Sequence, residues 1–197
     1  MDLTDEQLLR YSRQIMLPDV DIAGQEKLLQ ATVLIVGLGG LGSPVALYLA
    51  SAGVGRLILC DHDAVDLSNL QRQVVHNTSG IGQHKVDSAA TTLAAINPDV
   101  VLEKIPGKLH GDALTNAVAR ATVVVDATDN FDVRFELNRA CVATRVPLVS
   151  GAAIRWEGQI ALFDPREPES PCYRCLYAEG DTGALNCTEH GVIEPLV

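Results

Sequence analysis

Aromatic and basic residues are scarce in this chain. Phe, Trp and Tyr make up 4% of its 197 residues, and 15 Lys and Arg stand against 25 Asp and Glu, so the formal net charge is −10. Single-stranded nucleic acid is bound largely by stacking on aromatic side chains, and both nucleic acids and anionic membranes attract basic surfaces. We therefore expect no nucleic-acid or membrane partner, and a nucleotide would need locally placed Arg and Lys.

Long apolar runs are absent as well. The first residues, MDLTDEQLLR, are acidic and contain no apolar signal segment, and no apolar stretch approaches the roughly 20 residues of a membrane span. We expect a cytoplasmic protein. The five cysteines are an odd number, which predicts no disulfide framework, and the C-x-x-C pair Cys172 and Cys175 favours metal or redox chemistry.

A glycine-rich turn is the most informative pattern in the chain. Residues 33–42 read VLIVGLGGLG, an apolar, β-branched run that leads into a helix start at Ser43 and Pro44. The glycines of the turn are Gly37, Gly39, Gly40 and Gly42. The order strand, glycine turn, helix is typical of a phosphate cradle, because glycines let backbone N–H groups approach phosphate at a helix N-terminus. The pattern predicts nucleotide binding; the alternative is a purely structural turn.

Apolar strand-like runs alternate with helical stretches along the rest of the chain. We expect strands from Val33, at Arg56–Asp61, Val100–Ile105, Thr122–Ala127 and Pro147–Gly151, and after Gln159. Helices are expected from a Thr4 capping box to Pro18, and at Gln25–Gln30, Val45–Ala52, Lys85–Ile96, 112–120 with Asp112 as the cap, and Asp132–Thr144. This order predicts an α/β fold: a Rossmann-like, doubly wound, mostly parallel sheet with helices on both faces and an N-terminal helical extension. We expect one domain over residues 1–197, with helices in 1–30, the core in 31–165 and a cysteine-bearing loop in 166–190.

Acidic residues follow two of the predicted strands, at the sheet edge where ligands bind in such folds. Asp61 stands where a carboxylate accepts hydrogen bonds from ribose hydroxyls; the alternative is an exposed strand-end turn. Asp129 and Asn130 follow a later strand, where a carboxylate can hold Mg²⁺ against triphosphate oxygens, although either residue could simply cap the next helix. Asp126 is expected to be a structural strand-end group.

A polar loop between two of the elements gathers groups that suit polyphosphate. It offers the side chains of Ser68, Asn69, Gln71 and Arg72, and Lys85 begins the next helix. Arginine binds phosphate with a planar fork and lysine as a point charge, whereas such a loop read by itself is usually just solvated. Cations beside a carboxylate suit a triphosphate that undergoes nucleotidyl transfer.

Several separate motifs, in order, give the chain a family resemblance over nearly its whole length. They are RYSRQI at 10–15, GLGGLGSP, SNLQRQ, the Asp129-Asn130 pair, VPLVSGAA, EGQI and CYRCL. With these motifs the chain resembles the ubiquitin-activating-like adenylyltransferases of sulfur-carrier activation, the HesA/MoeB/ThiF family. The likeness is greatest to members that act in molybdenum cofactor biosynthesis, with members of the thiamine pathway next.

The resemblance implies an activity. Such enzymes bind ATP with Mg²⁺ and adenylate the C-terminal Gly-Gly carboxylate of a ubiquitin-fold sulfur carrier, here the molybdopterin-synthase small subunit or, alternatively, the thiamine carrier. It implies phosphate contacts from Gly40, Asn69, Arg72 and Lys85, ribose at Asp61, Mg²⁺ at Asp129, and an Arg13 that reaches the ATP of the partner subunit in a homodimer. A desulfurase or sulfurtransferase is implied as a further partner.

The cysteines match the family only in part. Cys172 and Cys175 resemble half of its structural zinc site, while the second C-x-x-C expected near the C-terminus is absent, so either the chain is a shortened form or the site is rebuilt. Cys187 and His190 are candidates to complete it. Cys187 also lies where some relatives carry a cysteine that bonds covalently to the carrier, against the alternative of a loop thiol with no role.

The sequence also leaves open two alternative functions of other classes. A nicotinamide-dependent oxidoreductase would use the same glycine turn and Asp61, but has no need of Arg72, Lys85 and Asp129 together. A dimeric, non-catalytic nucleotide-binding module would bind nucleotide without pyrophosphate exchange.

Overall fold

A single six-stranded sheet forms the centre of the protein. The computed structural model describes residues 3–178. Its strands are β1 (Thr32–Val36), β2 (Arg56–Cys60), β3 (Val101–Ile105), β4 (Val123–Asp126), β5 (Leu148–Ile154) and β6 (Glu157–Phe163). They lie in the order β3-β2-β1-β4-β5-β6, with β6 antiparallel to β5 and the other pairs parallel. The predicted doubly wound, mostly parallel sheet is confirmed.

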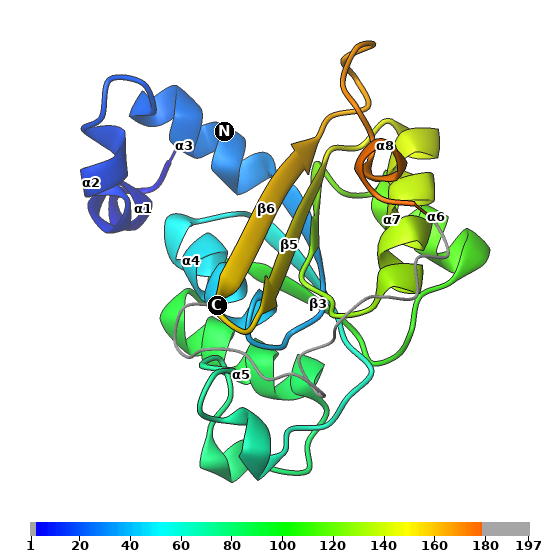
Figure 1. Cartoon of the computed structure of the whole chain (residues 1–197). Helices are drawn as coiled ribbons and strands as arrows, with labels where there is room; N and C mark the ends of the chain where they lie inside the picture. The colour runs from blue at the N-terminus through cyan, green and yellow to red at the C-terminus, as the bar shows by residue number, and fades with distance from the viewer. Residues whose placement is uncertain (1–2, 179–197) are drawn as a thin grey trace.

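Helices cover both faces of the sheet (Figure 1). On one face α4 (Gly42–Ala52) and α5 (Lys85–Ile96) pack on residues such as Ile35, and on the other face α6 (Gly111–Ala119) and α7 (Phe131–Thr144) pack on residues such as Leu34. The short helix α8 (Tyr173–Leu176) joins the second layer through the buried ring of Tyr173. The strands β1 and β2 are covered on both faces, and their buried residues are therefore apolar without alternation.

The N-terminal extension consists of α1 (Asp5–Arg10), α2 (Ser12–Ile15) and α3 (Asp21–Gln30), which lie to one side of the sheet in Figure 1. The Thr4 capping box is present, but the single helix expected up to Pro18 is divided at Tyr11. The ring of Tyr11 is buried against Gly53, the left-handed C-cap of α4, and its hydroxyl accepts a hydrogen bond of 2.9 Å from Asn97. This tyrosine anchors the extension to the core.

Other element boundaries differ from expectation for local reasons. Helix α4 begins at Gly42 rather than Val45, because proline is tolerated in the first turn of a helix. Helix α6 begins at Gly111 after His110, so Asp112 is not its cap. Strand β5 extends to Ile154 because it pairs along its whole length with β6. Among the described residues, none of the helices is long and apolar enough to cross a membrane.

Candidate functional site

The order of the strands reverses between β1 and β4, so the loops that follow these strands run in opposite directions and leave a crevice between them. A cavity of about 430 Å³ lies there. The sequence-predicted site residues that line it are Gly37, Gly39, Gly40, Asp61, Asn69, Arg72, Lys85, Asp129 and Asn130. Residues predicted from five separate segments of the sequence are thus brought together at one place.

The glycines of the turn serve two different purposes. Gly37 has φ +92°, and a Cβ there would lie 2.6 Å from the carbonyl oxygen of Ala127. A Cβ on Gly42 would lie 1.8 Å from the carbonyl oxygen of Gly37. At Gly39 the nearest atom to an added Cβ is Nε2 of Gln73 at 3.7 Å, an ordinary contact. Gly37 and Gly42 are therefore needed for packing within the protein, whereas the bare backbone of Gly39 leaves room on the cavity side.

Asp61 joins β2 to the glycine turn. The residue is 8% exposed, and its carboxylate accepts hydrogen bonds from the backbone N–H of Leu38 at 2.7 Å and from that of Asp63 at 2.8 Å. The carboxylate therefore holds the turn in place while it lines the cavity. Its contact with ribose remains a prediction.

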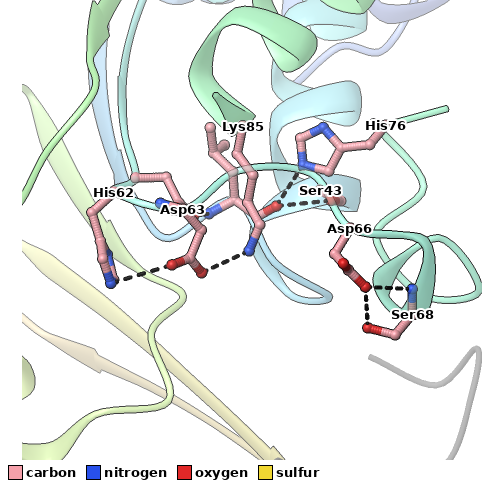
Figure 2. A network of polar contacts seen from close by, with 9 residues as sticks. Ser43, His62, Asp63, Asp66, Ser68, His76 and Lys85 are labelled. Carbon is pink, nitrogen blue, oxygen red and sulfur yellow. Dashed lines mark hydrogen bonds and ion pairs between the residues drawn. The ribbon is translucent and has the colours of Figure 1, made fainter. Parts of the chain in front are cut away.

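The predicted phosphate ligand Lys85 is held by a carboxylate that the sequence reading did not include. Its side chain is 6% exposed, and its Nζ donates to Asp63 at 2.9 Å, while His62 lies 3.3 Å from the other oxygen of the same carboxylate (Figure 2). Burial alone would raise the pKa of Asp63, but the hydrogen bond and charge of Lys85, together with His62 and Lys108, outweigh it and lower the pKa below its usual value. Asp63 thus stays ionised and orients the lysine at the cavity wall.

The loop after β4 separates a structural aspartate from the exposed one. Asp126 is buried and accepts hydrogen bonds from Ser150 at 2.6 Å and from the hydroxyl of Thr128 at 2.7 Å, as expected of a structural strand-end group. Asn130 is the N-cap of α7 and accepts from the N–H of Val133 at 3.2 Å, which is the alternative role considered for it. Asp129 is exposed on the cavity wall, where a carboxylate can meet a cation.

Among the described residues, four of those predicted at the nucleotide site do not line the cavity. Gly42, Ser68, Gln71 and Arg13 are not among the lining residues of the cavity. The hydroxyl of Ser68 donates to Asp66 at 2.6 Å, and Gln71 and Arg13 are exposed.

Sequence reasoning missed other residues that do line the cavity. Gln73 is 4% exposed, and its Oε1 has no hydrogen-bond partner among the described residues. Lys108 and His110 follow β3 and also line the cavity. The rule that ligands bind beyond the carboxyl ends of parallel strands would have found these two residues had it been applied to β3.

The cysteines fall into two groups. Burial, followed by the negative charge of Asp61 or Asp126, raises the pKa of Cys60 and of Cys141 to about 12, so these thiols belong to the core. Cys172 and Cys175 lie near the surface with their sulfurs 3.8 Å apart. Cys187 and His190 lie outside the described residues.

The sheet order and the polar cavity at its switch point define a doubly wound α/β protein of the Rossmann-like class. Comparison with known families makes this more specific. The ThiF family model matches residues 11–197, and the chain therefore belongs to the ThiF family. The family resemblance inferred from the motifs is confirmed.

Named relatives are similar over the whole chain. The chain is 50% identical over 196 residues to the molybdopterin-synthase adenylyltransferase of Salmonella typhimurium, covering 100% of this chain and 78% of that protein. It is 48% identical over 195 residues to the sulfur carrier protein ThiS adenylyltransferase of Escherichia coli, covering 99% and 77%. Among solved structures, that of E. coli MccB with ATP superimposes with a TM-score of 0.74 at 28% identity, covering 84% of this chain and about half, 51%, of that one.

Proposed function

We propose that the protein binds ATP with Mg²⁺ in the cavity between β1 and β4 and adenylates the C-terminal glycine of a ubiquitin-fold sulfur carrier. The observation that carries this proposal is the meeting of a glycine turn, the cations Arg72 and Lys85, and the exposed carboxylate of Asp129 in a single cavity. A nicotinamide oxidoreductase needs a pyrophosphate turn but not this set of charges. Similarity to named adenylyltransferases supports the same reaction.

For this reaction the protein needs mainly to position the two substrates and to neutralise the charge of the phosphates. The carrier's carboxylate oxygen attacks the α-phosphorus of ATP, a new P–O bond forms, the bond from the α-phosphorus to the bridging oxygen breaks, and pyrophosphate leaves. Arg72 and Lys85 would contact the phosphates, Asp129 would hold Mg²⁺, and the metal would neutralise charge on the leaving group. The nucleophile belongs to the substrate, so Cys187→Ala is expected to leave pyrophosphate exchange nearly intact.

ATP–pyrophosphate exchange with purified carriers tests the proposal. Exchange is expected with the molybdopterin-synthase small subunit, and exchange only with the thiamine carrier would favour the alternative substrate. Arg72→Ala and Asp129→Ala should each lower exchange about a hundredfold or more, since each removes an oriented partner for developing charge. Asp112→Ala, an exposed carboxylate outside the cavity lining, is the control. Nucleotide binding without exchange with either carrier would favour the non-catalytic module.

We further propose that the active form is a homodimer. Arg13 is exposed on α2 and does not line the cavity of its own chain within the described residues, which is consistent with a role in the partner's site. Ile160 and Leu162 on β6 are 82% and 63% exposed, on the sheet face opposite to that of the buried Phe163. Among the described residues this apolar face of β6 is exposed, and it offers a surface for a second copy.

Complementation tests the dimer. Arg13→Ala and Asp129→Ala proteins are each expected to be inactive, and mixing them should restore part of the exchange, because one site of a mixed dimer keeps both residues. No recovery after confirmed subunit exchange would remove Arg13 from the partner's site. Ile160→Glu should shift the mass measured by analytical ultracentrifugation toward the monomer.

We also propose that Cys172 and Cys175 supply two of the four ligands of a structural Zn²⁺. Zn–S bonds of about 2.3 Å at a tetrahedral angle place two thiolates ~3.8 Å apart, and the observed separation is 3.8 Å. Burial would raise the pKa of Cys172, but hydrogen bonds from the backbone of Arg174 and the side chain of Asn138 outweigh it and lower the pKa, which favours the ligating thiolate. Mass spectrometry should find about one zinc per chain, lost in Cys172→Ser; a metal-free wild type would refute the site.

A further inference from the structure

The backbone of Leu38, which lies between the first two glycines of the turn, is held at both of its polar atoms. Its N–H donates to Asp61 at 2.7 Å. Its carbonyl oxygen lies 3.0 Å from Nε2 of His76 and 3.3 Å from Oγ of Ser43, and Figure 2 shows these two side chains pointing toward the same backbone oxygen. The side chains of Asp61, His76 and Ser43 are all buried.

The hydrogen-bond partners of His76 determine which tautomer its neutral imidazole adopts. A carbonyl oxygen can only accept, so Nε2 carries the hydrogen. The other nitrogen, Nδ1, lies 3.0 Å from Oγ of Ser88 and accepts from that hydroxyl in the neutral ring. Burial lowers the pKa of His76, and the charge of Lys85 acts in the same direction, against the Leu38 hydrogen bond and the charge of Asp61. The ring is therefore neutral near pH 7, with one donor, and that donor is used on Leu38.

Ser88 is itself held in place. It lies on α5, and a Cβ on Gly80 would stand 2.9 Å from its Oγ, so the hydroxyl is packed tightly against the backbone of the preceding loop. A helix on one face of the sheet is thereby linked through two buried side chains to the glycine turn. The chain of contacts runs from Ser88 through His76 to the carbonyl of Leu38.

The geometry of the peptide bond determines where the N–H of Gly39 points. In a planar trans peptide the C=O and the following N–H point in opposite directions. The carbonyl of Leu38 points back toward His76 and Ser43, so the N–H of Gly39 points away from them, and Gly39 lines the cavity. If this peptide turned over, a carbonyl oxygen would replace an N–H donor at that point, and it would repel an anion.

We propose that His76 is a positioning residue of the nucleotide site: its Nε2–H fixes the Leu38–Gly39 peptide so that the Gly39 N–H faces the phosphates of bound ATP. This inference rests on the proposed binding of ATP in the cavity. His76 is not a lining residue within the described chain, so it acts through the loop and not by contact. Its effect should therefore depend on the phosphates and not on the nucleoside.

Calorimetric titration with ATP, and displacement titration with adenosine, test this dependence. In His76→Leu the Kd of ATP should rise at least about tenfold, as for loss of a donor to a charged group, while the Kd of adenosine stays within about twofold of the wild type. His76→Gln should retain most of the ATP affinity, because a glutamine amide nitrogen can occupy the place of Nε2 and donate to the same carbonyl. His84→Leu, at an exposed histidine that does not line the cavity, is the matched control and should change neither constant.

Each result has a definite consequence. Equal losses for ATP and adenosine, or no loss for ATP, would overturn the positioning role while leaving the proposed function in place. A wild type that does not bind ATP would overturn both. If His76→Leu does not fold, Ser88→Ala is measured instead. This variant keeps the imidazole but removes the hydroxyl that fixes its tautomer, so a smaller rise in the Kd of ATP is expected, with no change in the Kd of adenosine. An unchanged ratio of the two constants in Ser88→Ala would overturn the inference.

Discussion

Two glycines in the same turn should respond in opposite ways when each is replaced by alanine. A Cβ on Gly42 would lie 1.8 Å from the carbonyl oxygen of Gly37 and 2.8 Å from its carbonyl carbon. Both atoms are backbone, so the clash cannot be relieved by a side-chain rotation. Within the described part of the chain, a Cβ on Gly39 would meet only Nε2 of Gln73 at 3.7 Å, and Gly39 does not have a left-handed φ.

The magnitudes follow from these contacts. Overpacking of a well-filled site costs about 1–3 kcal/mol, which lowers Tm by roughly 2–12 °C for a chain of this size. Gly42→Ala should therefore be clearly less stable. Gly39→Ala should be as stable as the wild type or more so, by about 0.4–1 kcal/mol, because alanine restricts the unfolded chain at a position whose backbone it can adopt. The added methyl group of Gly39→Ala would, however, occupy the space where a phosphate approaches the backbone.

Thermal unfolding and calorimetric titration with ATP separate the two effects. Gly39→Ala should show an unchanged or higher Tm and an ATP Kd raised at least about tenfold, because it removes close approach to several charge-assisted donors. Gly158→Ala on β6, where an added Cβ would make only a contact of 3.9 Å, is the control for the substitution itself. Normal ATP affinity in Gly39→Ala would refute the assignment of this turn as the phosphate cradle. An unchanged Tm in Gly42→Ala would refute the packing argument.

Further expected outcomes concern the loop, the N-terminal anchor and pH. Gln73→Ala should weaken ATP binding, because this amide is buried at the cavity and its oxygen has no hydrogen-bond partner among residues 3–178. Gln71→Ala, at an exposed residue, should leave the ATP Kd near the wild-type value. Tyr11→Phe removes the acceptor of a buried hydrogen bond of 2.9 Å and should lower the free energy of unfolding by about 1 kcal/mol. Tyr48→Phe, at a residue that is 76% exposed, is the control and should cause no measurable change in chemical denaturation. Burial lowers the pKa of His76 in the folded protein below its unfolded-state pKa, which is near 6.5. As the pH falls through this value, the unfolded chain binds a proton that the folded protein does not. The free energy of unfolding should therefore decrease between pH 7 and pH 5. His76→Gln should flatten the stability profile between pH 7 and 5, and a profile as steep as that of the wild type would contradict this reading.

The layered fold was predictable because its signals are local. Helix α5 begins and ends at the predicted residues, Lys85 and Ile96, since its start follows a polar loop and its end precedes Asn97-Pro98. The strands were recognisable as short apolar runs between glycine and polar segments, and their alternation with helices implies a parallel sheet. The carboxyl ends of parallel strands meet at one edge, and this placed Asp61 and Asp129 at a common site before any contact was known.

The choice among neighbouring polar residues was not predictable in the same way. Residues 67–80 form two short 3₁₀ turns and connecting loop, without a period that assigns one side to the cavity. As a result Gln71 was expected at the site, whereas Gln73 lines the cavity. The link from Ser88 through His76 to Leu38 joins residues 50 positions apart in the chain, and no local pattern indicates it.

The sequence by itself determined the class of fold and the place of the candidate site, because apolar periodicity, glycine turns and charges at strand ends are properties of short segments. It indicated the family through the resemblance of several separate motifs. Only the tertiary structure decided which glycines the packing requires, which glutamine faces the cavity, and which buried histidine orients the turn. Those roles depend on atoms from distant segments meeting within hydrogen-bond or van der Waals distance, and such meetings are set by the packing of whole layers and not by any one segment.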